Sequence, residues 1–174
     1  YTENSRPLPF LPHLALFHDA HLLITKAIVQ IAAAYDPGWD ALAYDPGWEP
    51  NHGISATWNA TSGTLNLVGT TSGDRYATAL QNVGFISYSE FPAHASSRRE
   101  FTTVIVDSGG VNSNTFRSFL EICGTPDAPV LQIEPGFASG AIASYTELGS
   151  PVLLAPNALV SDADNTSVAF ASVT

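Results

Sequence analysis

The residues of this chain that could carry out a reaction are few and are scattered along the sequence. Asp107-Ser108-Gly109 has the Asp-Ser-Gly pattern of catalysis by paired carboxylates, but that chemistry needs two carboxylates sharing a proton, and there is no second such motif. The five histidines form no His-x-x-x-His pair, and no serine stands in a Gly-x-Ser-x-Gly turn. We therefore expect no enzymatic activity and interpret the Asp107 segment as a turn after a strand.

Aromatic residues offer a second kind of chemistry. The doubled sequence "YDPGW" places Trp39 and Trp48 next to acidic residues. Aromatic faces beside carboxylates suit a carbohydrate, so these two tryptophans are candidates for ligand binding in a glycan-binding module. Aromatic side chains also bury large areas in a core or between subunits, and we favour that interpretation.

Composition limits the partners and the location of the chain. The net charge is −10, and the longest basic cluster is the pair Arg98-Arg99, so a nucleic acid would be repelled. No apolar stretch is long enough to cross a bilayer. The sequons at Asn59 and Asn165 indicate glycosylation and an extracellular or cell-surface location. The single cysteine, Cys123, is expected to be a small buried hydrophobe.

Apolar residues alternate with a period of two along most of the chain, which predicts strands separated by turns. One short helix is expected over 74–81, and one short strand inside the loop 35–50. A half-buried strand is expected at 63–69, and further strands are expected at 27–31, 83–89, 100–107, 115–122 and 129–134. Many short strands with regular turns predict an all-β fold, a β-sandwich.

Two segments share residues at a fixed spacing. "YTENSRPLPFLP" (1–12) and "YTELGSPVLLAP" (145–156) match at Tyr, Thr, Glu and both prolines, at an offset of 145 − 1 = 144 residues. The same offset places Ala171 on Ala27 and Val173 on Val29. The sequence therefore predicts one domain over 1–144, with 145–174 as the first strands of the next copy.

The second copy has no place in the first domain, because residues 24–31 already fill the equivalent strand. An unpaired strand exposes backbone N–H and C=O groups, so it must pair with a following copy or with a neighbouring subunit. We expect copies of the chain to be the partners, in a linear homopolymer or tandem array. The residues expected to make this assembly are Val152, Leu154, Val168, Phe170 and Val173.

Several segments carry a family resemblance: "YTEN", "DAD", "GTLNLVG", "YATALQNVGFISYS", "RREFTTVIVDSGG" and "PDAPVL". Together they resemble the cadherin-like tandem repeats of very large secreted and surface proteins, over nearly all of the repeat and in the family's order. The resemblance implies immunoglobulin-like β-sandwiches strung head to tail and used for adhesion or as a stalk or fibre. It also implies acidic residues at the junctions that often hold Ca²⁺.

The calcium ligands follow from the resemblance alone. The junction motifs match Glu3, Asp107, Asp127, Glu147, Asp162 and Asp164. Carboxylate oxygens suit the hard Ca²⁺ ion. Pro126, however, stands where the family usually has Asn, and the first copy reads "FHDAH", with His18 or His21 in place of an acid that a hard cation prefers. The alternative is that these carboxylates cap turns and keep the surface acidic and soluble.

Overall fold

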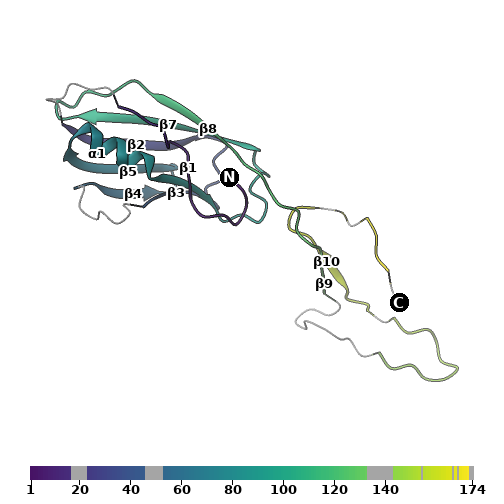
Figure 1. The fold of residues 1–174 in the computed structure, drawn as a ribbon. Helices are drawn as coiled ribbons and strands as arrows, with labels where there is room; N and C mark the ends of the chain where they lie inside the picture. Colours follow the sequence, from purple (N-terminus) through teal and green to yellow (C-terminus); the bar gives the residue numbers. More distant parts are fainter. Residues whose placement is uncertain are drawn as a thin grey trace. The chain divides into compact units, whose positions relative to one another are not determined.

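The computed structural model describes residues 1–16, 23–45, 53–132, 143–153, 155–165, 167 and 169–172. These residues belong to two compact units, Tyr1–Thr125 and Pro126–Thr174. The described part of the first unit contains one helix and eight strands (Figure 1): β1 (Leu8–Pro9), β2 (Ile24–Ala33), β3 (Asp40–Tyr44), β4 (Ser55–Asn59), β5 (Thr64–Thr71), α1 (Gly73–Gln81), β6 (Val83–Ser87), β7 (Arg98–Asp107) and β8 (Phe116–Glu121). The second unit contains β9 (Val130–Gln132) and β10 (Leu159–Ser161).

The larger sheet of the first unit has five antiparallel strands in the order β4-β5-β2-β7-β8. Its central strands follow the alternation read from the sequence: Leu65 and Leu67 of β5 are buried, and Asn66 between them is partly exposed. Val29 of β2 lies opposite Leu65 and is fully buried. β4 and β8 are the two edge strands of this sheet, and each has only one partner strand in it.

A second, three-stranded sheet has the order β1-β6-β3 and is also antiparallel. It packs on the larger sheet through Phe85 of β6 and Phe101 of β7, whose rings lie edge to face with centroids 5.8 Å apart. Both phenylalanines are fully buried, as is Leu42 of β3 apart from 3% of its surface. This arrangement is compatible with the predicted β-sandwich.

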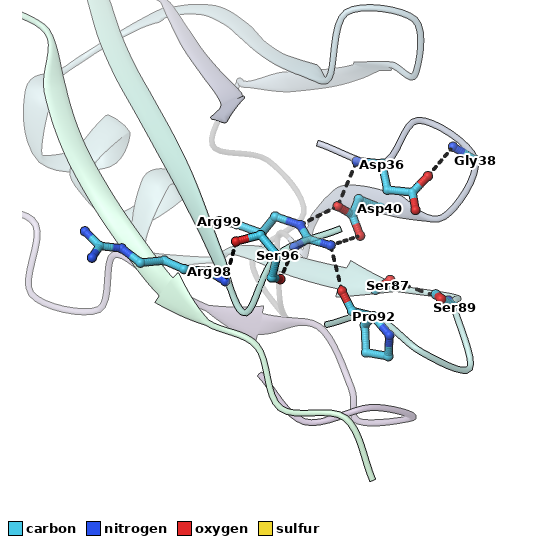
Figure 2. Close-up of polar contacts among 9 residues, drawn as sticks. All are labelled: Asp36, Gly38, Asp40, Ser87, Ser89, Pro92, Ser96, Arg98 and Arg99. Carbon is cyan, nitrogen blue, oxygen red and sulfur yellow. Dashed lines mark hydrogen bonds and ion pairs between the residues drawn. The ribbon is translucent and has the colours of Figure 1, made fainter. Parts of the chain in front are cut away.

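One buried ion pair joins the two sheets. Arg99 of β7 is fully buried, and its Nε donates to Oδ2 of Asp40 in β3 at 2.7 Å (Figure 2). The remaining guanidinium nitrogens donate to the carbonyl oxygens of Ser96 at 2.7 Å and Pro92 at 2.9 Å. Asp40 also accepts the backbone N–H of Asp36 at 3.1 Å. A buried guanidinium satisfied in this way fixes the strands and loops that surround it.

The helix α1 lies where the sequence predicted it and buries one face. Tyr76, Ala79 and Leu80 are buried, a spacing that places them on one side of the helix. The Tyr76 hydroxyl donates to the carbonyl oxygen of Gly69 at 2.7 Å, and desolvation raises the pKa of Tyr76 to about 12. Among the described residues, no helix is both long enough and apolar enough to cross a membrane.

The second unit is organised differently from the first. Its strands β9 and β10 form a short antiparallel pair, with Leu131 opposite Val160. Not one of the described residues in this unit is buried. The predicted domain boundary at 144/145 lies inside this unit, and the division into 1–144 and 145–174 stays a prediction.

Most of the expected elements are confirmed by the structure. The short strand expected inside the "YDPGW" loop is β3, and the strands expected around 27–31, 63–69, 83–89, 100–107, 115–122 and 129–134 are β2 and β5 to β9. One prediction was wrong: Cys123 is exposed, because Ile122 takes the inward-facing position (3% exposed) and its neighbour points outward. The strands β1 and β4 were not predicted.

Candidate functional site

The candidate site is the first anchor segment, residues 1–12, together with the groove that holds it. Tyr1 is 8% exposed, and its ring meets Phe85 edge to face with centroids 5.2 Å apart. Its hydroxyl donates to the carbonyl oxygen of Ser87 at 2.9 Å. The backbone nitrogen of Tyr1 donates to the carbonyl oxygen of Glu121 at 2.7 Å, and the N–H of Cys123 donates to the carbonyl oxygen of Tyr1 at 2.8 Å. A large aromatic ring with a satisfied hydroxyl makes a strong anchor.

Glu3 is the second anchor and is 6% exposed. Its Oε2 accepts hydrogen bonds from the backbone nitrogen of Thr125 at 3.0 Å and from the hydroxyl of the same residue at 3.3 Å. The N–H of Glu3 donates to the carbonyl oxygen of Cys123 at 3.1 Å. Hydrogen bonds to a carboxylate are stronger than those between neutral groups, so Glu3 ties the segment firmly to residues 123–125.

The rest of the segment lies close against β6 and β7. A Cβ at Gly84 would lie 3.0 Å from the Cβ of Pro7, so glycine is what allows the two backbones to approach here. Phe10 stacks on Phe101 with ring centroids 4.1 Å apart, and Leu11 is 3% exposed. Both ends of the segment therefore pack in the hydrophobic core, whereas residues 4–9 between them are exposed.

The second anchor segment, residues 145–156, repeats the first turn of the first segment. In the first copy the N–H of Ser5 donates to the carbonyl oxygen of Thr2 at 3.2 Å. In the second copy the N–H of Gly149 donates to the carbonyl oxygen of Thr146 at 2.9 Å. Both donor and acceptor are displaced by 149 − 5 = 146 − 2 = 144 residues, the offset read from the sequence.

A second turn follows the same offset. The N–H of Leu14 donates to the carbonyl oxygen of Leu11 at 3.1 Å, and the N–H of Ala158 donates to the carbonyl oxygen of Ala155 at 3.2 Å. Again 158 − 14 = 155 − 11 = 144. Pro12 and Pro156 lie inside these turns, where a fixed φ favours the bend. The two copies therefore share local backbone structure as well as sequence.

The first turn also contains a residue in the left-handed region in both copies. Asn4 has φ 58° and Leu148, at the equivalent position, has φ 61°. Asparagine tolerates this conformation, whereas leucine is strained in it. Leu148 is also 96% exposed, so the second copy holds the turn without packing around that side chain.

The two anchor segments differ in their surroundings. Tyr145, the equivalent of Tyr1, is 64% exposed, and Leu153 is 75% exposed. Glu147, the equivalent of Glu3, is exposed. The second copy thus presents the same anchors without a groove around them in the described part of its unit.

The predicted assembly residues are only partly described. Val152 is 44% exposed and Phe170 is 80% exposed. Leu154, Val168 and Val173 lie outside the described residues. The described residues around Phe170 are not part of a strand, and their predicted pairing with another copy stays a prediction.

The predicted calcium ligands occupy several different settings. Asp107 caps a turn, since its Oδ1 accepts the N–H groups of Gly109 and Val111 at 2.8 Å each. Glu147 is exposed and Asp127 partly exposed. No described contact tests the calcium prediction as a whole.

Asp162 and Asp164 are predicted ligands that lie side by side in the second unit. Oδ1 of Asp162 accepts the N–H groups of Asp164 at 3.2 Å and Asn165 at 2.9 Å. The hydrogen bond between the two carboxyl groups lowers the pKa of Asp162 and raises that of Asp164.

The remaining candidate residues lie at the surface. Asn59 is exposed at the end of β4, and its Oδ1 accepts the N–H of Thr61 in the following turn at 2.9 Å. Asn165 is exposed and donates to Oδ1 of Asp164 at 3.0 Å. Trp39 is 50% exposed, and Trp48 lies outside the described residues. The backbone carbonyl oxygen of Trp39 accepts the N–H of Tyr88, which is itself 64% exposed. Two exposed aromatic residues are therefore neighbours on adjacent backbone segments.

Neither a protein-family model nor a curated protein or solved structure matches this chain. The resemblance to cadherin-like repeats accordingly stays a prediction. Sequence reasoning identified Tyr1 and Glu3 through the repeat, but it missed the residues that receive them. The glycine at position 84, next to a valine at the start of a predicted strand, was the available signal for a close backbone approach.

Proposed function

We propose that this chain is a structural module of a linear extracellular array, a repeat or subunit of a filament or giant adhesin. Its modules would be immunoglobulin-like or cadherin-like sandwiches joined head to tail through a segment shared at the boundary. The observation that carries the proposal is the pair of anchor segments: one is built into a sandwich, and the other has the same turns but open anchors.

The exposed anchors supply the driving force. Burying a large apolar side chain contributes about 1.5–3 kcal/mol. Tyr145 gains this contribution when it enters a groove like the one that holds Tyr1. The equivalent groove is supplied by a following copy in the same chain, or by a neighbouring subunit in which residues 145–156 displace that subunit's own residues 1–12.

Either route makes the contact heterologous, because the surface that donates the segment differs from the surface that accepts it. Heterologous contacts that do not close into a ring generate open filaments. Glycans at Asn59 and Asn165, calcium at the acidic residues and an extracellular location belong to the same proposal.

The test is sedimentation of the full chain over a range of concentrations, compared with the double variant Tyr145→Ala/Glu147→Ala. We expect the unmodified chain to associate and the double variant to associate at least about tenfold more weakly, since about 1.4 kcal/mol corresponds to tenfold. Tyr88→Ala is the matched control, because Tyr88 has the same exposed fraction as Tyr145, 64%. Monomers at every concentration, or an equal loss in the control, would contradict the proposal.

A second candidate function is glycan binding, which the adjacent open residues Trp39 and Tyr88 favour. Sugar rings stack on exposed aromatic faces. In this case Trp39→Ala abolishes binding to a glycan array and leaves sedimentation unchanged. Unchanged glycan binding by the variant would remove this candidate.

A further inference from the structure

The repeat extends beyond the anchor segments to the strand that follows them. β10 follows the second anchor segment and pairs with β9, with Leu159 opposite Gln132 and Val160 opposite Leu131. At the offset of 144 residues, Leu159 falls on Ala15 and Val160 falls on Leu16. The first copy should therefore have a strand like β9 beside Ala15 and Leu16.

No such strand is present among the described residues of the first unit. Ala15 and Leu16 belong to no strand, and neither makes a backbone hydrogen bond with another described residue. Ala15 is exposed and Leu16 partly exposed. The preceding turn is the one that both copies share, so the backbone enters the two segments in the same way.

Hollows lie beside these two residues. One, of about 230 Å³, is lined by Ala15 and Leu16 on one side and by residues of β7 and its continuation, including Thr103, on the other. A second, of about 420 Å³, adjoins it and reaches Ser118 of β8. Both are lined by Phe116, which is 43% exposed. Together they form what we call the β8 groove, next to the open edge of the larger sheet.

Two polar atoms in the β8 groove have no partner. The hydroxyl of Thr103, a residue only 4% exposed, makes no hydrogen bond, and neither does the buried hydroxyl of Ser118. Buried hydroxyls normally make at least one hydrogen bond, so the absence of one at both residues points to a missing partner. An extended backbone offers both N–H and C=O groups, and therefore suits two hydroxyls that can each donate or accept.

We propose that the β8 groove receives β9 of a second copy of this chain, with Leu131 opposite Leu16 and Gln132 opposite Ala15. The proposal rests on the proposed function and names a second accepting surface, beside the groove that holds residues 1–12. Val130 and Leu131 are 55% and 60% exposed, so β9 carries apolar side chains that a groove lined by Phe116 would cover. β9 exchanges its three-residue pairing with β10 for an equivalent pairing in the neighbouring copy.

The register makes a disulfide test possible. In a Cys123→Ser background, one full-length chain carries Leu16→Cys and a second, differently tagged chain carries Leu131→Cys. Directly opposed residues of antiparallel strands lie roughly 4.5–5.5 Å apart at Cα, within reach of a disulfide. We expect mild oxidation to give a heterodimer joined through positions 16 and 131. The control replaces Leu16→Cys with Thr57→Cys, an exposed position in β4, the other edge strand.

A second pair of variants tests the groove itself. Phe116→Glu places a charge in the groove and should lower the yield of the heterodimer about tenfold. Phe119→Glu alters the same strand at a residue of similar exposure, 49%, that does not line the groove, and should leave the yield unchanged.

Equal cross-linking with position 57, or no heterodimer, overturns the proposal. A chain that carries both Leu16→Cys and Leu131→Cys and forms only an intramolecular disulfide also overturns the proposal. Sedimentation separates this failure from failure of the proposed function. If association still depends on Tyr145 but positions 16 and 131 do not cross-link, only the register and the groove are refuted.

Discussion

The two anchor segments share five residues and two backbone turns, yet one is core and the other is surface. Tyr1 is 8% exposed and Tyr145 is 64% exposed. Local sequence therefore determines the turns, whereas burial depends on strands far away in the chain, β6, β7 and β8. The two segments therefore show that the local turns form without the distant strands that bury the segment.

The framework of the first copy depends on long-range contacts. Arg99 and Asp40 are 59 residues apart and join the two sheets (Figure 2). The carboxylates Asp162 and Asp164, in contrast, are near neighbours in sequence and lie in a unit where no described residue is buried. The following variants test this difference between the two units.

The largest effect is expected from Asp40→Ala. It leaves the guanidinium of Arg99 buried without its carboxylate, which costs about 3–5 kcal/mol of unfolding free energy. Asp164→Ala in the second unit should change that free energy by less than about 0.5 kcal/mol. Urea unfolding followed by tryptophan fluorescence measures both. Equal effects of the two variants would show that the buried pair does not hold the framework.

Tyr1→Ala and Tyr145→Ala compare the anchors directly. Removing the packed Tyr1 ring should cost about 3 kcal/mol of unfolding free energy, because a buried aromatic leaves a large cavity. Removing the exposed Tyr145 ring from dilute, monomeric protein should cost less than about 0.5 kcal/mol. Circular dichroism during urea unfolding gives both values. A similar cost at the two positions would mean that the second anchor is already packed.

A smaller effect is expected for Tyr76→Phe, which removes the hydrogen bond to Gly69 inside the first unit. The expected loss is about 1 kcal/mol at neutral pH. Because the pKa of Tyr76 is raised from 10.0 to about 12 in the folded chain, this residue stabilises the fold below pH 10, and the stabilisation is lost as the pH rises toward 12.

Thermal unfolding between pH 8 and pH 12 should therefore show a loss of stability above pH 10 that is smaller in Tyr76→Phe than in the unmodified chain. Identical pH profiles would contradict the assignment. The difference between the two profiles reports on Tyr76, which is fully buried in the first unit.

The smallest effect is expected for Leu148→Asn, which gives the second copy the residue of the first. Removing leucine from the left-handed region should stabilise the turn by about 1 kcal/mol. The amide of Gly149, which donates across this turn, should then exchange roughly fivefold more slowly with deuterium. Faster exchange would show that the strain lies elsewhere.

Sequence patterns predicted local features well. The alternation in "GTLNLVG" correctly gave the inward face of β5, and the turn at Asp36-Pro37-Gly38 correctly preceded β3, whereas residues 46–47 of the second Asp-Pro-Gly lie outside the described residues. These features depend on neighbours in sequence. The offset of 144 residues likewise predicted equivalent positions whose turns the structure reproduces.

Long-range features were not predictable in the same way. Nothing around Arg99 signals that this arginine is buried, because its partner is 59 residues away. β4 was missed because Ser55–Asn59 is an edge strand with polar residues and weak alternation. Cys123 was assigned to the wrong face because one residue of register reverses which side chain points inward.

The most direct test extends the second copy. Since 174 − 144 = 30, residues 31–144 of the same chain are joined after Thr174, so that the strands that follow residue 30 in the first copy follow the second copy in the same order. Deuterium exchange at residues 145–153 should then slow to the rate of residues 1–9 in the first copy. Exchange as fast as in the original chain would contradict the claim that the second anchor segment begins a further sandwich.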